Sequence, residues 1–323
     1  FTLKNSFPQK NVRRGADLKP ALENNAMVFN SDYIANKLLA LRWHCPSVAI
    51  SSIGKSVMGR PLLAACFGVG ERRVLFSASH HANEWITSLI LLKFMQELCE
   101  KSKETGEIYG FPANEILDNA TLCFVPLINP DGVDLAIGSL RSGRYFSRAK
   151  KIAEAYPAIP FPTGWKANIV GTDLNLQYPA GWEEAKRVKY ALGMTKPAPR
   201  DFVGGAPLSE PESRALADFT ERLSPDTIIA LHSQGKVIYW KYADLEPQGS
   251  RRLGVKLARA SGYELSETPA ASGSAGYKDW FIKNFDRPGY TLELGMGENP
   301  LPLEQFDKIY ADTAPMLAIA AIG

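Results

Sequence analysis

Two histidines and one glutamate of this 323-residue chain have the spacing of metal ligands. His81 and Glu84 are separated by two residues, and His232 lies far downstream, directly after an apolar run. Imidazole and carboxylate groups are ligands of catalytic zinc, whose fourth position is left for water. The three residues predict a zinc site. The competing interpretation is a chance HxxE pair and a histidine that is hydrogen-bonded in the fold.

A second carboxylate, that of Glu293, stands between apolar residues in the segment TLELG. Burying an unpaired carboxylate is costly, so this group needs either a cationic partner or a chemical role. A general base that takes a proton from water is such a role, because burial raises a carboxyl pKa toward neutrality. The residues alone leave the ion pair and the general base equally open.

Apolar runs near these residues predict an α/β sheet. Segments 121–128 and 227–231 are almost uniformly apolar, which is typical of strands covered on both faces, and each lies near helical segments. In open α/β sheets the active site lies beyond the carboxyl ends of the strands, where His81 and His232 are expected. Further strands are predicted at 47–53, 62–69, 73–78 and 290–294.

Capping residues and apolar periodicity predict helices between and after these strands. Ser31 is the predicted N-cap of a helix over 31–43, and Ser209 with Glu212 forms a predicted capping box for a helix that ends near residue 223. Two further helices are predicted at 84–100 and 303–322. Residues 1–26 lack periodicity and predict an N-terminal arm, whereas 27–323 predict one domain with the Pro-rich segment 155–165 as a surface loop.

Composition excludes several classes of protein. The chain is 45% hydrophobic and 22% charged, with 37 basic and 34 acidic residues and a net charge of +3. So small and dispersed a charge predicts no nucleic-acid partner. No apolar stretch reaches the roughly 18 residues that a transmembrane helix needs, so no such helix is expected.

The four cysteines show no CxxC spacing. Three of them lie in apolar segments, where a thiol behaves as a small buried hydrophobic group. Free buried thiols are therefore predicted in preference to disulfides, and they favour a cytoplasmic over a secreted protein.

Five motifs occur in a fixed order along the chain: HANEW at 81–85, NPDG at 129–132, GTDLN at 171–175, LHS at 231–233 and TLEL at 291–294. Together they resemble the zinc metallocarboxypeptidase family, and the resemblance extends from about residue 27 to the C-terminus. It implies that His81, Glu84 and His232 hold one zinc ion and that Glu293 is the base and acid. It also implies a single-domain fold with a mixed, mostly parallel eight-stranded sheet between helices.

Within that family, further segments are similar to the bacterial γ-D-glutamyl-meso-diaminopimelate peptidase I branch. This resemblance implies hydrolysis of the bond between D-glutamate and the diamino acid in peptides derived from peptidoglycan. The segments are WKAN at 165–168, QYPAGW at 177–182, PRDFVG at 199–204, PLSEPE at 207–212, KDW at 278–280 and GENPLP at 297–302.

Departures from the pancreatic type of carboxypeptidase concern substrate binding. That type has an Asn-Arg pair for the substrate carboxylate, but here Asn175 is followed by Leu176. Its mobile tyrosine falls on Ala271, so Tyr277 is the candidate substitute. Together with Arg200 of the PRDFVG segment, Asn175 and Tyr277 are predicted to bind substrate.

The cation for the oxyanion is predicted to be Lys166, by alignment on Trp165, with Arg141, Arg144 and Arg148 as rivals. The main alternative function is a carboxypeptidase that removes C-terminal residues. An inactive module that binds cell-wall peptides is disfavoured, because the three metal ligands and Glu293 are all present. The 26 residues of the arm are too few for an attached wall-binding repeat, so none is expected.

Overall fold

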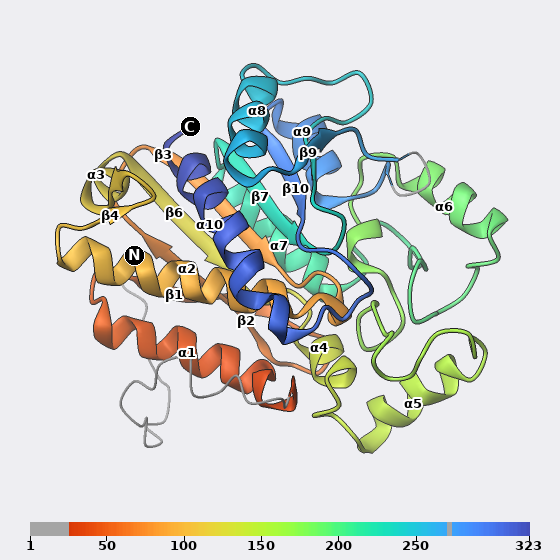
Figure 1. Cartoon of the computed structure of the whole chain (residues 1–323). Coiled ribbons are helices and arrows are strands. Elements are labelled where there is room, and N and C mark those ends of the chain that lie inside the picture. Colours follow the sequence, from red (N-terminus) through yellow and green to blue (C-terminus); the bar gives the residue numbers. More distant parts are fainter. Residues whose placement is uncertain (1–25, 270–272) are drawn as a thin grey trace.

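A mixed sheet of eight strands organises the chain (Figure 1). The computed structural model describes residues 26–269 and 273–323. The strand order is β1-β2-β6-β3-β7-β10-β8-β9, and the central strands β6, β3, β7 and β10 are parallel to one another. The strands are β1 (Ala49–Lys55), β2 (Pro61–Phe67), β3 (Arg72–Ala78), β6 (Ala120–Val125), β7 (Thr227–His232), β8 (Val237–Tyr239), β9 (Glu264–Ser266) and β10 (Gly289–Glu293). This arrangement confirms the predicted α/β sheet.

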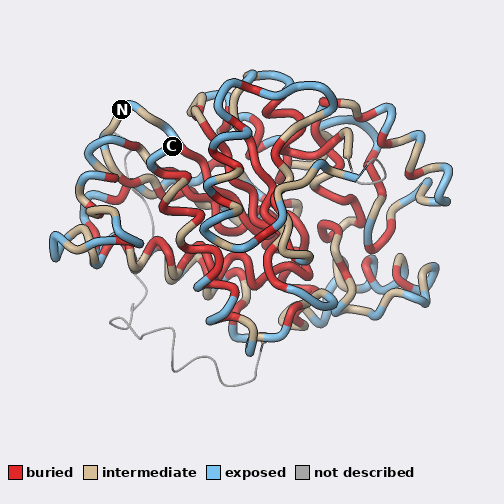
Figure 2. The backbone as a smooth tube through the Cα atoms, turned by 45° about the horizontal axis from the view of Figure 1, so that its top comes forward, coloured by how far each residue is buried: buried red, intermediate tan, exposed pale blue. Residues whose placement is uncertain are grey.

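Helices cover both faces of this sheet. One face packs against α1 (Ser31–His44), α2 (Ile86–Lys103), α8 (Ser250–Ser261) and α10 (Phe306–Ile322), and the other against α7 (Pro211–Leu223) and α9 (Tyr277–Phe285). In Figure 2 the buried residues are concentrated in the interior and the exposed ones at the periphery. The other helices are α3 (Ala113–Asn119), α4 (Pro130–Ala136), α5 (Gly143–Ala153) and α6 (Trp182–Ala191), and a small hairpin pairs β4 (Glu107–Ile108) with β5 (Phe111–Pro112).

Three neighbouring parallel strands end at the same edge of the sheet. In the register of β3, β7 and β10, Ala78 lies beside Leu231 and His232 lies beside Glu293. Parallel strands have their carboxyl ends on one side, so the side chains that follow them converge there. The sheet therefore brings together the predicted ligands and base from three distant parts of the chain.

Some predictions from the sequence concern residues that the structure does not describe, and others can be compared with it directly. Residues 1–25 of the predicted arm and Ala271 lie outside the described residues. Segment 155–165 follows α5 without regular strand or helix structure, as predicted for a loop. Within the described ranges, no helix is both long enough and apolar enough to span a membrane.

Both predicted N-cap residues are wrong by one position. Asn30, not Ser31, caps α1, and its side-chain oxygen accepts the Tyr33 N–H at 2.9 Å. Ser31 instead donates its hydroxyl to Asp134. At α7 the N-cap residue is Glu210, whose side chain makes no capping hydrogen bond, and the Ser209 hydroxyl donates to the Gln177 side chain. Tertiary partners take the hydroxyls that local sequence assigns to the helix ends.

The four cysteines form two disulfides, which corrects the prediction of free thiols. Cys45 after α1 is bonded to Cys99 of α2, and Cys66 of β2 is bonded to Cys123 of β6, its direct partner in the antiparallel register. Apolar neighbours indicate burial of a cysteine but not what lies opposite to it. The argument for a cytoplasmic protein therefore loses its basis, since stable disulfides are typical of oxidising compartments.

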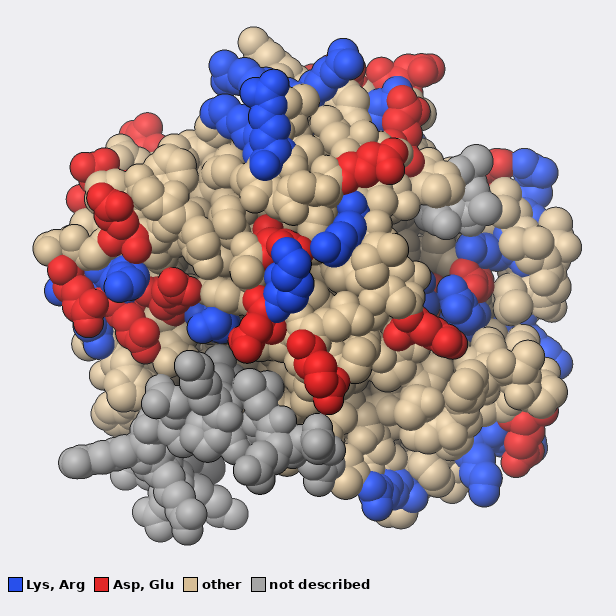
Figure 3. All heavy atoms as spheres, viewed as in Figure 1, with Lys and Arg blue, Asp and Glu red and all other residues tan. Residues whose placement is uncertain are grey.

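Charged side chains of both signs are interspersed on the face drawn in Figure 3, except where basic side chains gather at the top over α8. The exposed basic residues of that helix are Arg251, Arg252, Lys256 and Arg259.

A buried carboxyl at the start of α7 joins this helix to the β1–β2 turn. Glu212 is fully buried and accepts the backbone N–H of Val57 at 2.9 Å. Burial raises the pKa of Glu212 to about 7, and the nearby Asp131 and Glu210 act in the same direction. The folded protein therefore holds this group in its neutral form over a range of pH in which the unfolded chain ionises it.

This raised pKa makes stability fall as pH rises. The contribution of Glu212 to the free energy of unfolding is fully present below the pKa of this group in the unfolded chain. About 3 kcal/mol of it is lost as the pH rises from about 4.5 to 7. We expect the free energy of unfolding of Glu212→Gln, measured by urea denaturation, to depend less on pH across this range than that of the wild type. The exposed Glu221→Gln on the same helix is the control. Equal pH slopes for Glu212→Gln and the wild type would contradict this assignment.

Candidate active site

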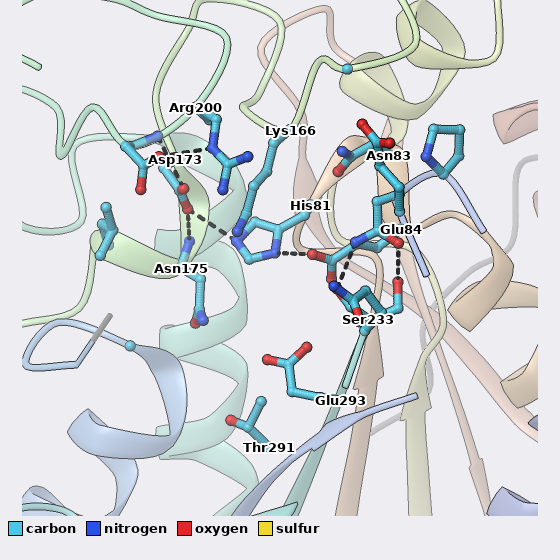
Figure 4. A pocket seen from close by; sticks show the side chains of 18 of the residues that line it. His81, Asn83, Glu84, Lys166, Asp173, Asn175, Arg200, Ser233, Thr291 and Glu293 are labelled. Atoms are coloured by element: carbon cyan, nitrogen blue, oxygen red, sulfur yellow. Dashed lines mark hydrogen bonds and ion pairs between the residues drawn. The ribbon is translucent and has the colours of Figure 1, made fainter. Parts of the chain in front are cut away.

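The turn between β3 and α2 carries two of the three predicted ligands (Figure 4). Ser79 adopts a positive φ of 50°, and its hydroxyl contacts that of Ser88 at 2.7 Å within the turn. The chain then forms a short 3-10 helix, Ala82–Glu84, with His81 at its N-cap. Positive φ is unfavourable for residues other than glycine, so the surrounding hydrogen bonds hold a conformation that presents His81 and Glu84 together.

The three predicted ligands converge in space. The Nδ1 atoms of His81 and His232 lie 3.1 Å apart, and the Glu84 carboxylate is 2.8 Å from the first and 3.0 Å from the second. All three side chains are buried, and their ligand atoms lie within 4.8 Å of one another. Burial alone would raise the pKa of Glu84, but the imidazoles of His81 and His232 hold it well below its ordinary value.

These residues fit a zinc ion by the chemistry of their donor set. Two ring nitrogens that face each other at 3.1 Å beside a carboxylate present lone pairs to one point, as ligands of one cation do. The other ring nitrogen of His81, Nε2, lies 3.1 Å from the Asp173 carboxylate. A carboxylate behind a ligating histidine fixes its ring and increases its basicity. Asp173 is a functional residue to which no role is assigned from the sequence, although it stands in the GTDLN motif.

Lys166 supplies a cation beside this cluster. Its loop is tied to the ligand turn because the Ala82 N–H donates to the Lys166 carbonyl at 2.9 Å. Burial would lower the pKa of Lys166, but the Asp173 and Glu84 carboxylates reverse this effect and raise it, so the side chain is charged. The rivals Arg141, Arg144 and Arg148 are exposed and do not line the pocket.

Glu293 ends β10 and faces the same cavity, with Thr291 beside it (Figure 4). Burial and the nearby Glu84 carboxylate raise the pKa of Glu293 to about 8. Among the described residues, no basic side chain lies within ion-pair distance of the Glu293 carboxylate. Of the two interpretations left open by the sequence, this geometry favours a general base over a structural ion pair.

Two of the three predicted substrate-binding residues line the pocket. The side-chain oxygen of Asn175 accepts the backbone N–H of Tyr277 at 3.0 Å, which leaves its NH2 group for a ligand. Arg200 is fixed by its Nε, which donates to Asp201 at 2.8 Å. Its loop joins that of Lys166, whose N–H donates to the Pro199 carbonyl.

Tyr277 is the exception, and its predicted role as a substrate-binding side chain is wrong in this structure. Its ring is fully buried against Tyr178 and Trp280, and its hydroxyl lies 2.7 Å from that of Thr220. The residue does not line the pocket. What Tyr277 contributes is its backbone N–H, which orients Asn175.

The cavity that these groups share has a volume of about 770 Å³. Besides the predicted residues, its wall includes loop residues Ile159 and Pro160 and the charged side chains of Lys189 and Lys278. In the sequence, only the KDW motif draws attention to Lys278 as a residue of the site. A pocket lined by many charged side chains fits a polar, charged substrate better than an apolar one.

Comparison with known proteins agrees with this geometry. Residues 34–316 match the family model described as zinc carboxypeptidase. The chain is 39% identical over 291 residues to the γ-D-glutamyl-L-diamino acid endopeptidase 1 of Lysinibacillus sphaericus, covering 90% of this chain and 72% of that protein. It is 25% identical to human carboxypeptidase B over 76% of this chain and 58% of that protein.

Solved structures share the fold. Carboxypeptidase A from Helicoverpa armigera superposes with a TM-score of 0.67 at 17% identity, covering 94% of this chain and 76% of that one. The murein-tripeptide amidase of Escherichia coli O157 gives a TM-score of 0.53 at 19% identity, covering 84% and 91%. These likenesses confirm the predicted carboxypeptidase-like architecture.

Because the three candidate ligands converge on one point, removal of one of them should impair metal binding. In His232→Ala only two ligands remain, so we expect bound zinc to fall to near zero after dialysis and turnover to be lost with it. Elemental analysis of the dialysed protein is the measurement. The exposed His44 lies outside the site, and His44→Ala should keep both metal and activity. A wild-type protein that is free of metal and still turns over would contradict the metal site.

Proposed function

This chain belongs to the zinc carboxypeptidase family, and we propose that it hydrolyses the amide bond between D-glutamate and a diamino acid in peptides derived from bacterial peptidoglycan. One zinc ion per chain, held by His81, Glu84 and His232, is part of this proposal. The 39% identity to a γ-D-glutamyl-L-diamino acid endopeptidase over 90% of the chain supports the substrate class.

The structural observation that carries the proposal is the environment of Leu176. This residue follows Asn175, where the pancreatic type has the arginine of its carboxylate clamp. Leu176 is buried in an apolar cluster with Trp182 and Val203. A charge-assisted arginine contact to a carboxylate is worth about 1.5 to 3 kcal/mol, so its absence weakens selection for a free C-terminal carboxylate.

The chemistry follows from the placement of three groups. Glu293 accepts a proton from the attacking water, and its raised pKa matches this role. Lys166 donates a hydrogen bond to the oxygen of the scissile carbonyl as negative charge develops there. Glu293 then gives the proton to the leaving amine. A bound zinc ion supplies Lewis acidity for the carbonyl and for the water.

Asn175 and Arg200 offer donors for the carboxylates beside a γ-D-glutamyl bond. In that linkage the α-carboxylate of glutamate remains free, separated from the scissile carbonyl by the Cα, Cβ and Cγ atoms. The Asn175 NH2 group and the Arg200 guanidinium line the pocket near Lys166. We place both in substrate binding for this reason.

We further propose that residues 27–323 form the catalytic domain and that the protein works in an oxidising compartment. The family match over 34–316 supports the first, and the two disulfides support the second.

The role of Glu293 can be tested with metal in place. Glu293→Gln keeps the size of the side chain but cannot accept a proton at neutral pH, so we expect zinc to stay bound while kcat falls by at least about 10²-fold. Steady-state kinetics with metal analysis is the measurement. Glu304→Gln, an exposed position outside the pocket, is the control. A wild-type rate in Glu293→Gln would assign the base elsewhere.

The substrate class is tested by competition between two sets of peptides. We expect L-Ala-γ-D-Glu-meso-diaminopimelate, with or without a terminal D-Ala, to be cleaved at the γ-D-glutamyl bond, as seen by mass spectrometry. Ordinary peptides with aromatic or basic C-terminal residues should have a lower kcat/KM. The reverse order would favour the alternative, a carboxypeptidase, and no turnover of either set would favour an inactive binding module.

A further inference from the structure

The ammonium of Lys166 is not held by a partner of its own. Among residues 26–269 and 273–323, no group lies within hydrogen-bond or ion-pair distance of it. The side chain nevertheless lines the pocket and extends toward His81 (Figure 4). A side chain without a partner is placed by the backbone that carries it. The position of the loop around Lys166 therefore determines where this cation lies.

Asn129, the first residue of the NPDG motif, joins that loop to the turn that carries two of the metal ligands. Its side chain is fully buried. The NH2 group donates to the His80 carbonyl at 3.1 Å and to the Ala167 carbonyl at 3.0 Å, and the side-chain oxygen accepts the Gly132 N–H at 3.1 Å. Both N–H donors and the oxygen are thus in use. One side chain therefore connects the ligand turn with the loop that carries Lys166.

A single backbone contact supplements this connection. The Ala82 N–H donates to the Lys166 carbonyl at 2.9 Å. In the described part of the chain, this is the only other hydrogen bond between segments 79–85 and 165–168. Truncation of Asn129 would therefore leave the two segments joined by one hydrogen bond instead of three.

The packing of Gly132 shows how closely the Asn129 amide is enclosed. A Cβ atom on this glycine would lie 2.5 Å from the side-chain oxygen of Asn129, 2.7 Å from its side-chain nitrogen and 2.7 Å from the Ala167 carbonyl oxygen. These distances are shorter than van der Waals contact, so the amide and the carbonyl would have to move. The glycine thus permits the close approach on which the two donated hydrogen bonds depend.

We propose that Asn129 is a positioning residue that sets the place of the Lys166 ammonium relative to the metal-ligand cluster. This inference rests on the role of Lys166 in the proposed function, which is to stabilise the oxyanion. A donor of this kind is effective only where the charge develops, so a small displacement of its loop weakens it. Asn129 itself does not line the pocket, and its effect on the reaction passes through Lys166.

A double-mutant cycle tests this route, with kcat and KM measured on peptides that the wild type cleaves. We expect Asn129→Ala to lower kcat at least about 10-fold with KM and zinc content close to wild type, because an oxyanion contact is made mainly in the transition state. Lys166→Met should lower kcat about 10²- to 10³-fold. In that background Asn129→Ala should lower kcat by less than about 3-fold, since the cation that it positions is already absent. Fully independent losses, or loss of zinc from Asn129→Ala, would overturn the proposal.

A second variant keeps Asn129 and displaces its amide. Gly132→Ala should lower kcat in the same way, with little change in KM. Asn119→Ala is the matched control, because the NH2 group of Asn119 also donates to a backbone carbonyl, that of Glu115, but on the exposed side of α3 outside the pocket. It should keep the wild-type kcat. Melting temperatures show whether each variant folds, and a wild-type kcat in both Asn129→Ala and Gly132→Ala would overturn the proposal.

Hydrogen exchange gives a readout that does not depend on turnover. The Ala82 N–H donates to the Lys166 carbonyl, so loosening of the loop in Asn129→Ala should speed exchange of this amide at least about 10-fold, and Asn119→Ala should not. A wild-type kcat in Lys166→Met, or no turnover of any peptide, would contradict the proposed function and leave this exchange rate to decide the role of Asn129. Unchanged exchange of the Ala82 amide in Asn129→Ala would overturn that role.

Discussion

The parallel pairing of β3, β7 and β10 is the constraint on which the site depends. Their register sets His232 beside Glu293 and ends β3 at Ala78, three residues before His81. A shift of one residue between two strands would turn every side chain to the opposite face. The residues in that register are nearly all buried, which specifies the pairing strongly. Core packing thus determines the geometry of the catalytic groups.

Convergence of this kind concentrates charged groups that are largely withdrawn from solvent. Glu84 and Asp173 are buried beside His81 and His232, and the half-buried side chains of Glu293 and Lys166 line the same cavity as the two carboxylates. Each carboxylate except Glu293 has close imidazole partners. The pKa values diverge accordingly, since that of Glu84 is lowered and that of Glu293 is raised to about 8. Two carboxylates with opposite shifts in one site are suited to different tasks, one as ligand and one as proton carrier.

Sequence alone predicts the parts of this molecule that local pattern determines. The apolar runs predict the central strands, and residue types with motif order predict the three candidate ligands and Glu293, which the structure brings close together. Contacts between distant segments were not predictable in the same way. The four cysteines look like buried thiols until β2 is placed against β6 and α1 against α2. Tyr277 appears available in a loop, whereas its ring is part of the core.

Selectivity and chemistry are held by different parts of the fold. His232 and Glu293 stand at strand ends, whose positions the sheet fixes, but the groups proposed to bind the substrate come from segments beside it. Leu176 lies in a short helix after Asp173, and Arg200 lies in a loop. A substitution at either position alters the pocket wall without altering the register of β3, β7 and β10. The same sheet can therefore carry different substrate-binding segments, and on the proposed function Leu176 separates this chain from a carboxypeptidase that holds the substrate carboxylate with an arginine at that position.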